Sequence, residues 1–196
     1  GDLPSWNQSL AQEGGLILER RVLAMGDLAR EAREVFHTLT ESPQSLDVRY
    51  KNTVQVGDTD DAPTLTSAME TALASSVDRE VALGMTTVGP HRDDIELTAG
   101  GIHLSMYASR GEARSVALAL RLAEARLLED QRGDQPVLLL DDVLSELELK
   151  LRHLVLEATA AYEQTLLTTA DASLVGEKWL QKACSFHVAD GTVVPE

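Results

Sequence analysis

Cysteine and aromatic residues are scarce in this sequence, and each shortage excludes a way of stabilising the fold. One cysteine, Cys184, in 196 residues excludes an internal disulfide framework and suits a reducing cytoplasm. We expect Cys184 to be a small buried hydrophobe. Aromatic residues make up 4% of the chain and hydrophobic residues 43%, so we expect a globular core built mostly from Leu, Val and Ala.

Long apolar runs are also lacking. No run approaches the roughly 20 residues that span a bilayer. The first residues, GDLPSWNQ, have neither the basic stretch nor the apolar core of a secretory signal. We therefore expect a cytoplasmic protein without a membrane partner. Because the chain begins with Gly1 rather than Met, we expect a fragment or a processed chain.

Positive charge is in short supply. The chain has 17 Lys and Arg against 32 Asp and Glu, and its formal net charge is −15. Proteins that bind nucleic acid neutralise phosphates with an excess of Lys and Arg. The composition therefore argues against a chain that by itself encloses a nucleic acid.

The N-terminal part reads as mostly helical. Apolar residues spaced three and four apart predict one long helix over 6–40, ended at Ser42–Pro43. Residues 46–56 have strand character, and 64–83 again look helical. The acidic stretch 57–63 is expected to be a solvated turn, because it lacks the closing Glu of a calcium loop.

The helical pattern ends before the stretch TTVGPHRDDIEL, residues 86–97. Gly89–Pro90 predicts a turn, 95–98 a strand, and Gly100–Gly101 a hairpin connection to a strand over 102–108. Two interpretations of the polar group in this turn stay open: a turn with a local ion pair, or site residues held at a domain boundary. The group comprises His91, Arg92, Asp93 and Asp94.

A helix over 109–130 begins with a capping box. Ser109 can accept a hydrogen bond from the backbone at Glu112, and Glu112 can reach back. Gly111 allows close approach to the first turn. Such a helix start suits an anion such as phosphate, although many helices begin this way and bind nothing.

Two carboxylates follow a buried run at VLLLDD. The continuous apolar run over 137–141 predicts a parallel strand covered on both faces. Asp141 and Asp142 come at its carboxyl end, where α/β sheets bind ligands. Two adjacent carboxylates beside an apolar core are costly unless a cation satisfies them, and magnesium with a nucleoside triphosphate is the usual solution.

The remaining residues complete an α/β order of elements. Ser145 and Glu148 repeat the capping pattern and predict a helix to about residue 161. A buried strand over 164–169, a helix over 172–183 and a closing hairpin over 185–194 follow. Asp190–Gly191 is the predicted hairpin turn.

Four motifs in this order resemble the ATPase head of the RecF family, in the ABC/SMC group. They are GPHRDD (89–94), SRGEARSVALAL (109–120, like the ABC signature), LLLDDVLSELE (138–148, like Walker B and the D-loop) and LLTTAD (166–171, like the last sensor strand). The resemblance implies an α/β fold: the C-terminal lobe of an ABC/SMC-type head, with a parallel-sheet core and helices, plus a helical arm segment. It implies an arm over 1–83 and the head lobe over 84–196.

The resemblance also implies a role for each matching residue. Asp141 would hold the water shell of Mg²⁺, and Asp142 stands at the catalytic carboxylate position, where many relatives have Glu. Leu147 would belong to the D-loop at a dimer interface. The implied nucleotide-binding residues are Ser109, Arg110, Gly111 and Glu112 of the signature, Ser145 and Glu146 of the D-loop, and Thr169, where many relatives have His.

One motif is absent from these 196 residues: the phosphate loop G-x-x-x-x-G-K-[ST]. VGEKW (175–179) lacks its glycine spacing. The RecF family carries this loop near the N-terminus, so we expect this chain to be the C-terminal part of a longer protein and inactive alone. The resemblance implies an ATP-dependent clamp that dimerises with ATP and binds single- and double-stranded DNA at gaps and junctions. It would help RecO and RecR to load RecA.

Two other interpretations remain. The chain could be an isolated, non-catalytic interaction fragment. It could also be a receiver-like phosphoacceptor domain, which keeps paired aspartates at a strand end. A receiver domain needs a further acceptor aspartate at another strand tip and a later lysine strand, and neither is evident in the sequence.

Overall fold

The computed structural model describes residues 3–55, 57 and 61–195. Contacts divide the chain into unit 1 (Gly1–Glu34 and Gln44–Ala108) and unit 2 (Val35–Pro43 and Ser109–Glu196), which are described separately below. These contacts group residues 84–108 with unit 1, whereas the division at residue 83 into an arm and a head lobe stays a prediction. Most of the expected acidic turn at 57–63 lies outside the described residues.

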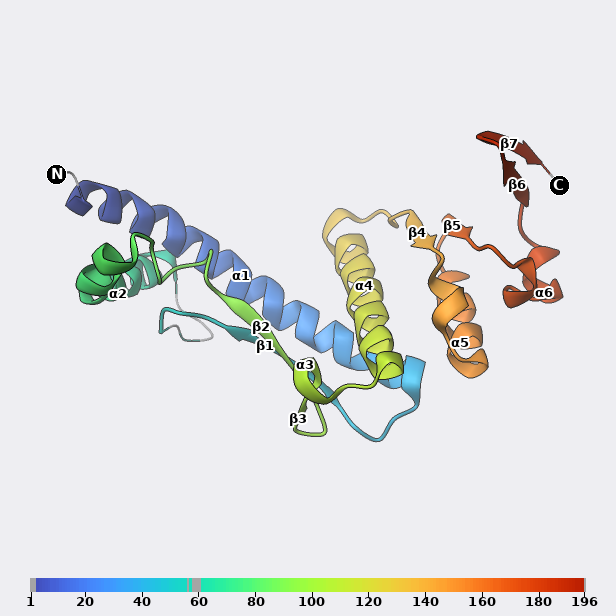
Figure 1. Cartoon of the computed structure of the whole chain (residues 1–196), viewed down its shortest axis with the longest axis horizontal. Coiled ribbons are helices and arrows are strands. Elements are labelled where there is room, and N and C mark those ends of the chain that lie inside the picture. The colour runs from blue at the N-terminus through green and yellow to red at the C-terminus, as the bar shows by residue number, and fades with distance from the viewer. Residues whose placement is uncertain (1–2, 56, 58–60, 196) are drawn as a thin grey trace. The chain divides into compact units, whose positions relative to one another are not determined.

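Unit 1 is built around two helices, α1 (Leu3–Thr40, up to Glu34 in this unit) and α2 (Ala62–Leu83) (Figure 1). Both were predicted, and each begins a few residues earlier than expected. The helices approach closely at Gly14, where an added Cβ would lie 2.2 Å from the sulfur of Met69. A helix-weakening glycine is tolerated there because it permits this contact. The core between them consists of Ala11, Leu18, Val54, Leu65, Met69 and Leu73.

The described residues of unit 1 also form an antiparallel sheet in the order β1 (Leu46–Lys51), β2 (Asp94–Ala99), β3 (Ile102–His103). The predicted turn at Gly100–Gly101 is confirmed, with φ of 55° and 80°. The predicted strand over 102–108 is wrong beyond His103, because the chain turns into the short helix α3 (Leu104–Tyr107). Met106 and Tyr107 are largely exposed there, so no burial favours a longer strand.

The turn with the sequence GPHRDD is tied to the rest of unit 1 by hydrogen bonds. The Asp93 carboxylate accepts from the Thr53 amide (2.7 Å), from the Thr53 hydroxyl (2.8 Å) and from the Tyr50 hydroxyl. The Arg21 guanidinium donates to the Pro90 carbonyl. The turn therefore joins α1, β1 and β2. These bonds run from the turn to other parts of unit 1, and Arg92 donates to the carbonyl of Thr86 (2.8 Å).

Unit 2 contains the helices α4 (Arg110–Arg132) and α5 (Leu149–Thr159) (Figure 1). The predicted capping box at Ser109 is confirmed, and Gly133 ends α4 with a φ of 76°. The end of α1 joins α4 and α5 around a groove of about 360 Å³, lined by Leu39, Leu122 and Tyr162 among others. This groove contains none of the predicted site residues.

A parallel pair of strands, β4 (Leu138–Asp141) and β5 (Thr165–Thr168), completes the centre of unit 2. The parallel arrangement was expected, but burial on both faces is wrong for the described residues. Leu138 and Leu140 are each 8% exposed, whereas Leu139 between them is 72% exposed. Successive side chains of a strand point to opposite faces, so only one face of this pair is covered here.

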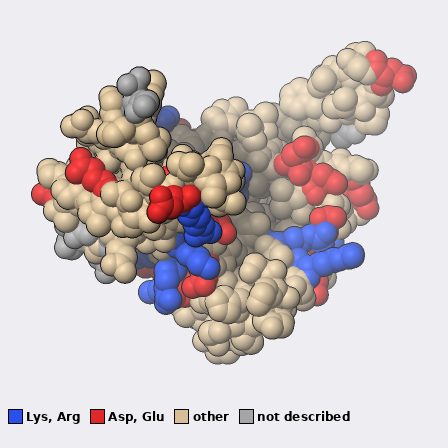
Figure 2. Space-filling view, turned by 60° about the vertical axis from the view of Figure 1, so that its left-hand side comes forward, with Lys and Arg blue, Asp and Glu red and all other residues tan. Residues whose placement is uncertain are grey.

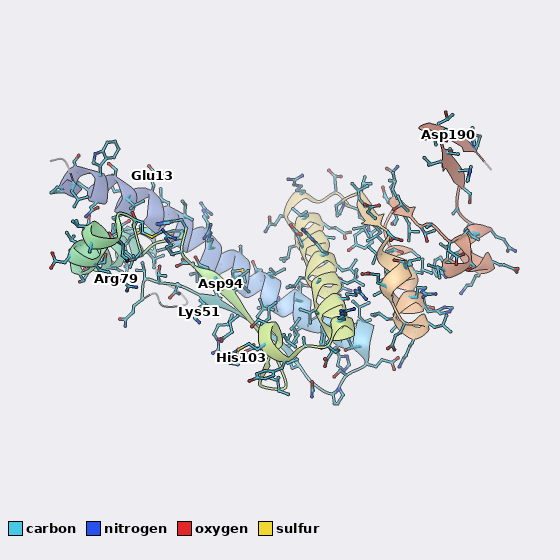
Figure 3. All side chains as sticks on the ribbon, viewed as in Figure 1. Glu13, Lys51, Arg79, Asp94, His103 and Asp190 are labelled. Carbon is cyan, nitrogen blue, oxygen red and sulfur yellow. The ribbon has the colours of Figure 1, made fainter. Side chains whose placement is uncertain are left out.

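The C-terminal region is less regular than predicted. The expected helix over 172–183 consists of a one-turn 3-10 helix, η2 (Ala172–Leu174), and α6 (Glu177–Leu180), because Gly176 between them has a φ of 79°. The hairpin of β6 (Phe186–Ala189) and β7 (Thr192–Pro195) is confirmed, with Asp190 at its tip (Figure 3). Cys184 is exposed, so the expectation that it is buried is wrong.

The structure contains no candidate for a transmembrane helix among residues 3–55, 57 and 61–195, because none of the helices there combines the required length and apolar character.

The Tyr50–Asp93 contact predicts loss of stability at alkaline pH. Burial, with the hydrogen bond to Asp93, raises the pKa of Tyr50 to about 12, above the ordinary value of roughly 10. The contribution of Tyr50 should be fully present below pH ~10 and lost as the pH rises through ~12. Tyr50→Phe should lower the unfolding free energy by about 1 kcal/mol at pH 8 and flatten this alkaline loss.

Denaturant unfolding between pH 8 and 12 measures both effects. Tyr107→Phe is the matched control, because Tyr107 is exposed. Equal alkaline slopes for Tyr50→Phe and the unchanged chain would contradict the prediction.

Candidate functional site

The carboxyl ends of β4 and β5 bring polar side chains together. Asp141 pairs with Thr168 in the parallel register. The Thr168 hydroxyl donates to the Asp141 carboxylate and accepts from the backbone N–H of Asp142 (3.0 Å). Thr168 therefore connects the two consecutive aspartates. Sequence reasoning singled out its neighbour Thr169. The sequence feature that could have identified Thr168 is its position as the last residue of the second parallel strand.

Asp142 has an unusual backbone conformation. Its φ is 50° and its ψ is 26°, in the left-handed region, which non-glycine residues enter uncommonly. The turn at Asp142 ends β4 and starts the one-turn 3-10 helix η1 (Val143–Glu146). Such conformations persist where the surrounding structure enforces them, and they cluster at functional sites.

The turn after Asp142 differs from the prediction. Ser145 does not cap α5, because it lies within η1 and its hydroxyl donates to the Asp142 carbonyl (2.9 Å). α5 starts later, at Leu149, with Glu148 at the N-cap position and no side-chain capping bond. Leu144 is fully buried and anchors the turn. The hydroxyl of Ser145 thus stabilises the turn that begins at Asp142.

Arg114 connects the start of α4 to this turn. Its guanidinium donates to the Glu146 carbonyl (3.0 Å) and forms an ion pair with the Glu146 carboxylate. Because Arg114 lies in the first turns of α4, the N-terminus of that helix and η1 belong to one region of unit 2. Arg114 was not among the predicted site residues. The sequence feature that could have identified Arg114 is its position five residues after Ser109, on the helix that begins with the capping box.

The N-terminus of α4 is open. The Ser109 amide donates to the Glu112 carboxylate (2.8 Å), and the Glu112 amide donates to the Ser109 hydroxyl (3.2 Å). The bond from the Ser109 backbone lowers the pKa of Glu112 below its usual value. A Cβ added at Gly111 would meet no described atom within 4 Å, and Arg110 is exposed. The first turn therefore faces open space rather than packed neighbours.

The loop after β5 is organised by its own side chains. The Thr169 hydroxyl donates to the Asp171 carbonyl (3.1 Å) and accepts from the Asp171 amide (3.2 Å). The Asp171 carboxylate accepts from the Ser173 amide (2.9 Å) and so caps η2. The Ser173 side chain, and then its backbone amide, lower the pKa of Asp171. Thr169 thus shapes this loop, whereas Thr168 makes the contact to the aspartates.

The oxygen atoms at the strand ends match the chemistry of a hard cation. Among the described residues, no group of three or more His, Cys, Asp and Glu could enclose a metal by itself. The Asp141 carboxylate lies beside the Thr168 hydroxyl, and Asp142, the next residue, supplies a second carboxylate. Mg²⁺ prefers such oxygen ligands and usually takes only one or two carboxylates, with phosphate oxygens and water completing its shell. The residues present fit Mg²⁺ with a phosphate ligand.

The chain is similar to curated proteins called DNA replication and repair protein RecF. It is 38% identical to that of Chloroflexus aggregans over 191 residues, which cover 97% of this chain and 49% of that protein. It is 39% identical to that of Chloroflexus aurantiacus over 193 residues, covering 98% and 49%. The chain thus spans about half the length of the curated relatives it matches. No family model matches it.

Solved structures agree. A structure of the recombination mediator protein RecF with ATPrS, in the RecFOR pathway, matches all of this chain and 51% of the other, with a TM-score of 0.84 and 26% identity. A RecF–ATP structure matches 99% of the chain with a TM-score of 0.81. An SMC head matches with a TM-score of 0.53 at 15% identity, which supports the fold alone.

These matches confirm the predicted fold class, an α/β lobe of an ABC/SMC-type ATPase head with a helical segment. By its sequence and its structure, the chain matches the C-terminal part of RecF.

Proposed function

We propose that this chain is the part of a RecF-type DNA-repair protein that supplies the Walker B and signature residues of an ATPase head. The arrangement of Asp141, Asp142 and Thr168 at the ends of two parallel strands is the observation that carries the proposal. Relatives solved with ATP and ATPrS support a nucleotide as the ligand. In this proposal residues 1–83 belong to a helical arm and 84–196 to the head lobe.

The aspartates have separate roles in this proposal. Asp141, whose carboxylate accepts from Thr168, binds the water shell of Mg²⁺. Asp142 orients and deprotonates the attacking water, as a carboxylate does in phosphoryl transfer. The left-handed backbone conformation of Asp142 ends the strand and starts the turn that follows it.

The N-terminus of α4 acts on a second nucleotide. Ser109, Arg110, Gly111 and Glu112 offer a hydroxyl, exposed backbone and the positive end of a long helix to the γ-phosphate of ATP bound by a second subunit. Ser145 and Glu146 lie at the same dimer interface. The Arg114 contacts support this assignment, because they join α4 to η1. Thr169 stands in the adjacent sensor loop.

The proposed partners are those of the RecF pathway. The protein forms an ATP-bound homodimer on single- or double-stranded DNA at gaps and junctions, and it assists RecO and RecR in loading RecA in the cytoplasm. Most DNA-contacting surface comes from outside this chain, whose net charge is −15. On the face in Figure 2, Lys and Arg form small groups among acidic and uncharged surface, in keeping with that view.

A non-catalytic role for the isolated chain has its own support. Apolar side chains that would be covered in a complete head are exposed here, among them Leu139, Leu166, Phe186, Val188 and Val193. A two-stranded hairpin without a covered face is marginal in water. We propose that the half of the relatives' length not matched here covers these side chains and supplies the phosphate loop.

The 196-residue chain by itself should therefore not hydrolyse ATP. It has no G-x-x-x-x-G-K-[ST] loop, whose lysine and backbone N–H groups hold the phosphates. Phosphate release from ATP and Mg²⁺ by the purified chain measures this. Turnover that Asp142→Asn abolishes would contradict the prediction, whereas turnover that survives this substitution indicates a contaminant.

Asp142→Asn in a longer RecF-type protein should abolish ATP turnover and preserve ATP binding, because the amide is isosteric but cannot accept a proton. We expect at least a hundredfold loss of kcat with a nearly unchanged Kd for ATP. Asp130→Asn, at an exposed position of α4, is the matched control and should change neither quantity. An unchanged kcat in Asp142→Asn would reject the assignment.

Substitutions of Ser109 distinguish a role in phosphate binding from a role in helix capping. Ser109→Ala should cost about 1 kcal/mol of stability, whereas Ser109→Asp should keep it, because aspartate caps a helix as well as serine. The negative charge of Ser109→Asp should repel the incoming phosphate and block ATP-dependent dimerisation. Thermal unfolding and sedimentation with and without ATP read the two effects. Normal ATP-dependent dimers of Ser109→Asp would leave Ser109 with a capping role only.

A further inference from the structure

The first turn of α5 carries two bases where helices favour acids. Lys150 and Arg152 lie there, close to the positive end of the helix macrodipole, and the turn Leu149–Arg152 contains no acidic residue. A cation at this end of a helix is unfavourable, because the macrodipole is positive there. Each base therefore requires a compensating partner. Lys150 has one, because its ammonium pairs with the Glu41 carboxylate.

Arg152 has a different kind of partner. Its guanidinium donates to the backbone carbonyl of Leu147 (2.8 Å), the residue that ends the turn starting at Asp142. That turn is also bonded from the other side, by Arg114 at Glu146. The segment Val143–Leu147 is thus held between one arginine of α4 and one of α5.

A second loop lies within electrostatic reach of Arg152. Its positive charge contributes to the lowered pKa of Asp171, although the hydrogen bonds from Ser173 contribute more. Asp171 is bonded to Thr169 in the loop that follows β5. Arg152 is therefore bonded to the segment that follows β4, and its charge favours the ionised form of Asp171 in the segment that follows β5.

One donor of Arg152 is not used. Within the described part of the chain, its Nε is buried and has no hydrogen-bond partner. A buried N–H without an acceptor destabilises the fold, and a guanidinium can satisfy two acceptors through its fork. The Asp171 carboxylate is an acceptor of the right charge.

We propose that Arg152 is a positioning residue of the ATPase site: it holds the turn Val143–Leu147 through the Leu147 carbonyl and aligns that turn with the Thr169–Asp171 loop. When the nucleotide is bound and the site closes, Nε gains the Asp171 carboxylate as its acceptor. This inference rests on the proposed function, and it adds a residue that orients Asp142 without touching the nucleotide.

Kinetics of Arg152→Gln in a longer RecF-type protein test this proposal. We expect kcat to fall about tenfold or more, and the Kd for ATP to change less than threefold at a temperature where the variant is folded. Arg152→Lys should recover part of kcat, because lysine keeps the charge but has no fork. Arg121→Gln is the matched control, since Arg121 is an exposed arginine paired with Glu124 on α4. A kcat within twofold of wild type for Arg152→Gln would overturn the proposal, as would parallel losses of melting temperature, binding and turnover.

A double-mutant cycle with Asp171→Asn tests the link between the loops. Asparagine keeps the cap on Ser173 but removes the charge. The effects of Arg152→Gln and Asp171→Asn on kcat should be less than additive if the two side chains act together. Additive effects would overturn the alignment of the two loops.

A structural measurement separates this inference from the proposed function. If the wild-type protein shows no turnover that depends on Asp142, the proposed function fails. Hydrogen exchange still tests Arg152: Arg152→Gln should speed exchange at least tenfold at amides within Val143–Leu147 and in the Thr169–Ser173 loop, and leave α4 unchanged. Unchanged exchange in both segments would overturn the positioning role.

Discussion

The parallel pairing of β4 with β5 is the constraint on which the site depends. It places Asp141 opposite Thr168, and the Thr168 hydroxyl then bonds both consecutive aspartates. A shift of the register by one residue would exchange the faces of the strand and separate these groups. Thr168 is therefore the residue that ties the Asp141 carboxylate to the backbone of Asp142 at the strand end.

Two arginines extend this order to the helices on either side. Arg114 bonds the Glu146 carbonyl from α4, and Arg152 bonds the Leu147 carbonyl from α5. The left-handed conformation of Asp142 is thus followed by a turn that both helices hold. Backbone carbonyls accept both of these bonds, and the Glu146 carboxylate adds an ion pair to the Arg114 attachment. The arrangement is hydrogen-bonded near the carboxylates and open at the N-terminus of α4, as the proposed contact with a second subunit requires.

Exposed apolar side chains mark the parts of unit 2 that the described residues leave uncovered. Leu139 is exposed between two buried leucines, and both strands of the β6–β7 hairpin are exposed. The continuous apolar pattern of β4 predicts burial on both faces, whereas the described structure covers only the face with Leu138 and Leu140. The chain spans about half the length of its RecF relatives, and in the proposed function the half not matched here covers the exposed side chains. The core of unit 1, by contrast, is closed by its own helices.

The sequence by itself determined the local elements whose signals are local: the long apolar periodicity of α1, the capping box at Ser109, the turn at Asp190–Gly191 and the carboxylates that follow β4. Each depends on residues within a few positions of one another, so spacing alone identifies it. Only the tertiary structure decided that Ser145 donates within η1 instead of capping α5, and that Thr168, Arg114 and Arg152 organise the aspartates. Those contacts join segments far apart along the chain, or depend on where a turn ends. The spacing of residues in the sequence does not predict these contacts, because register and packing determine which groups on different elements form hydrogen bonds.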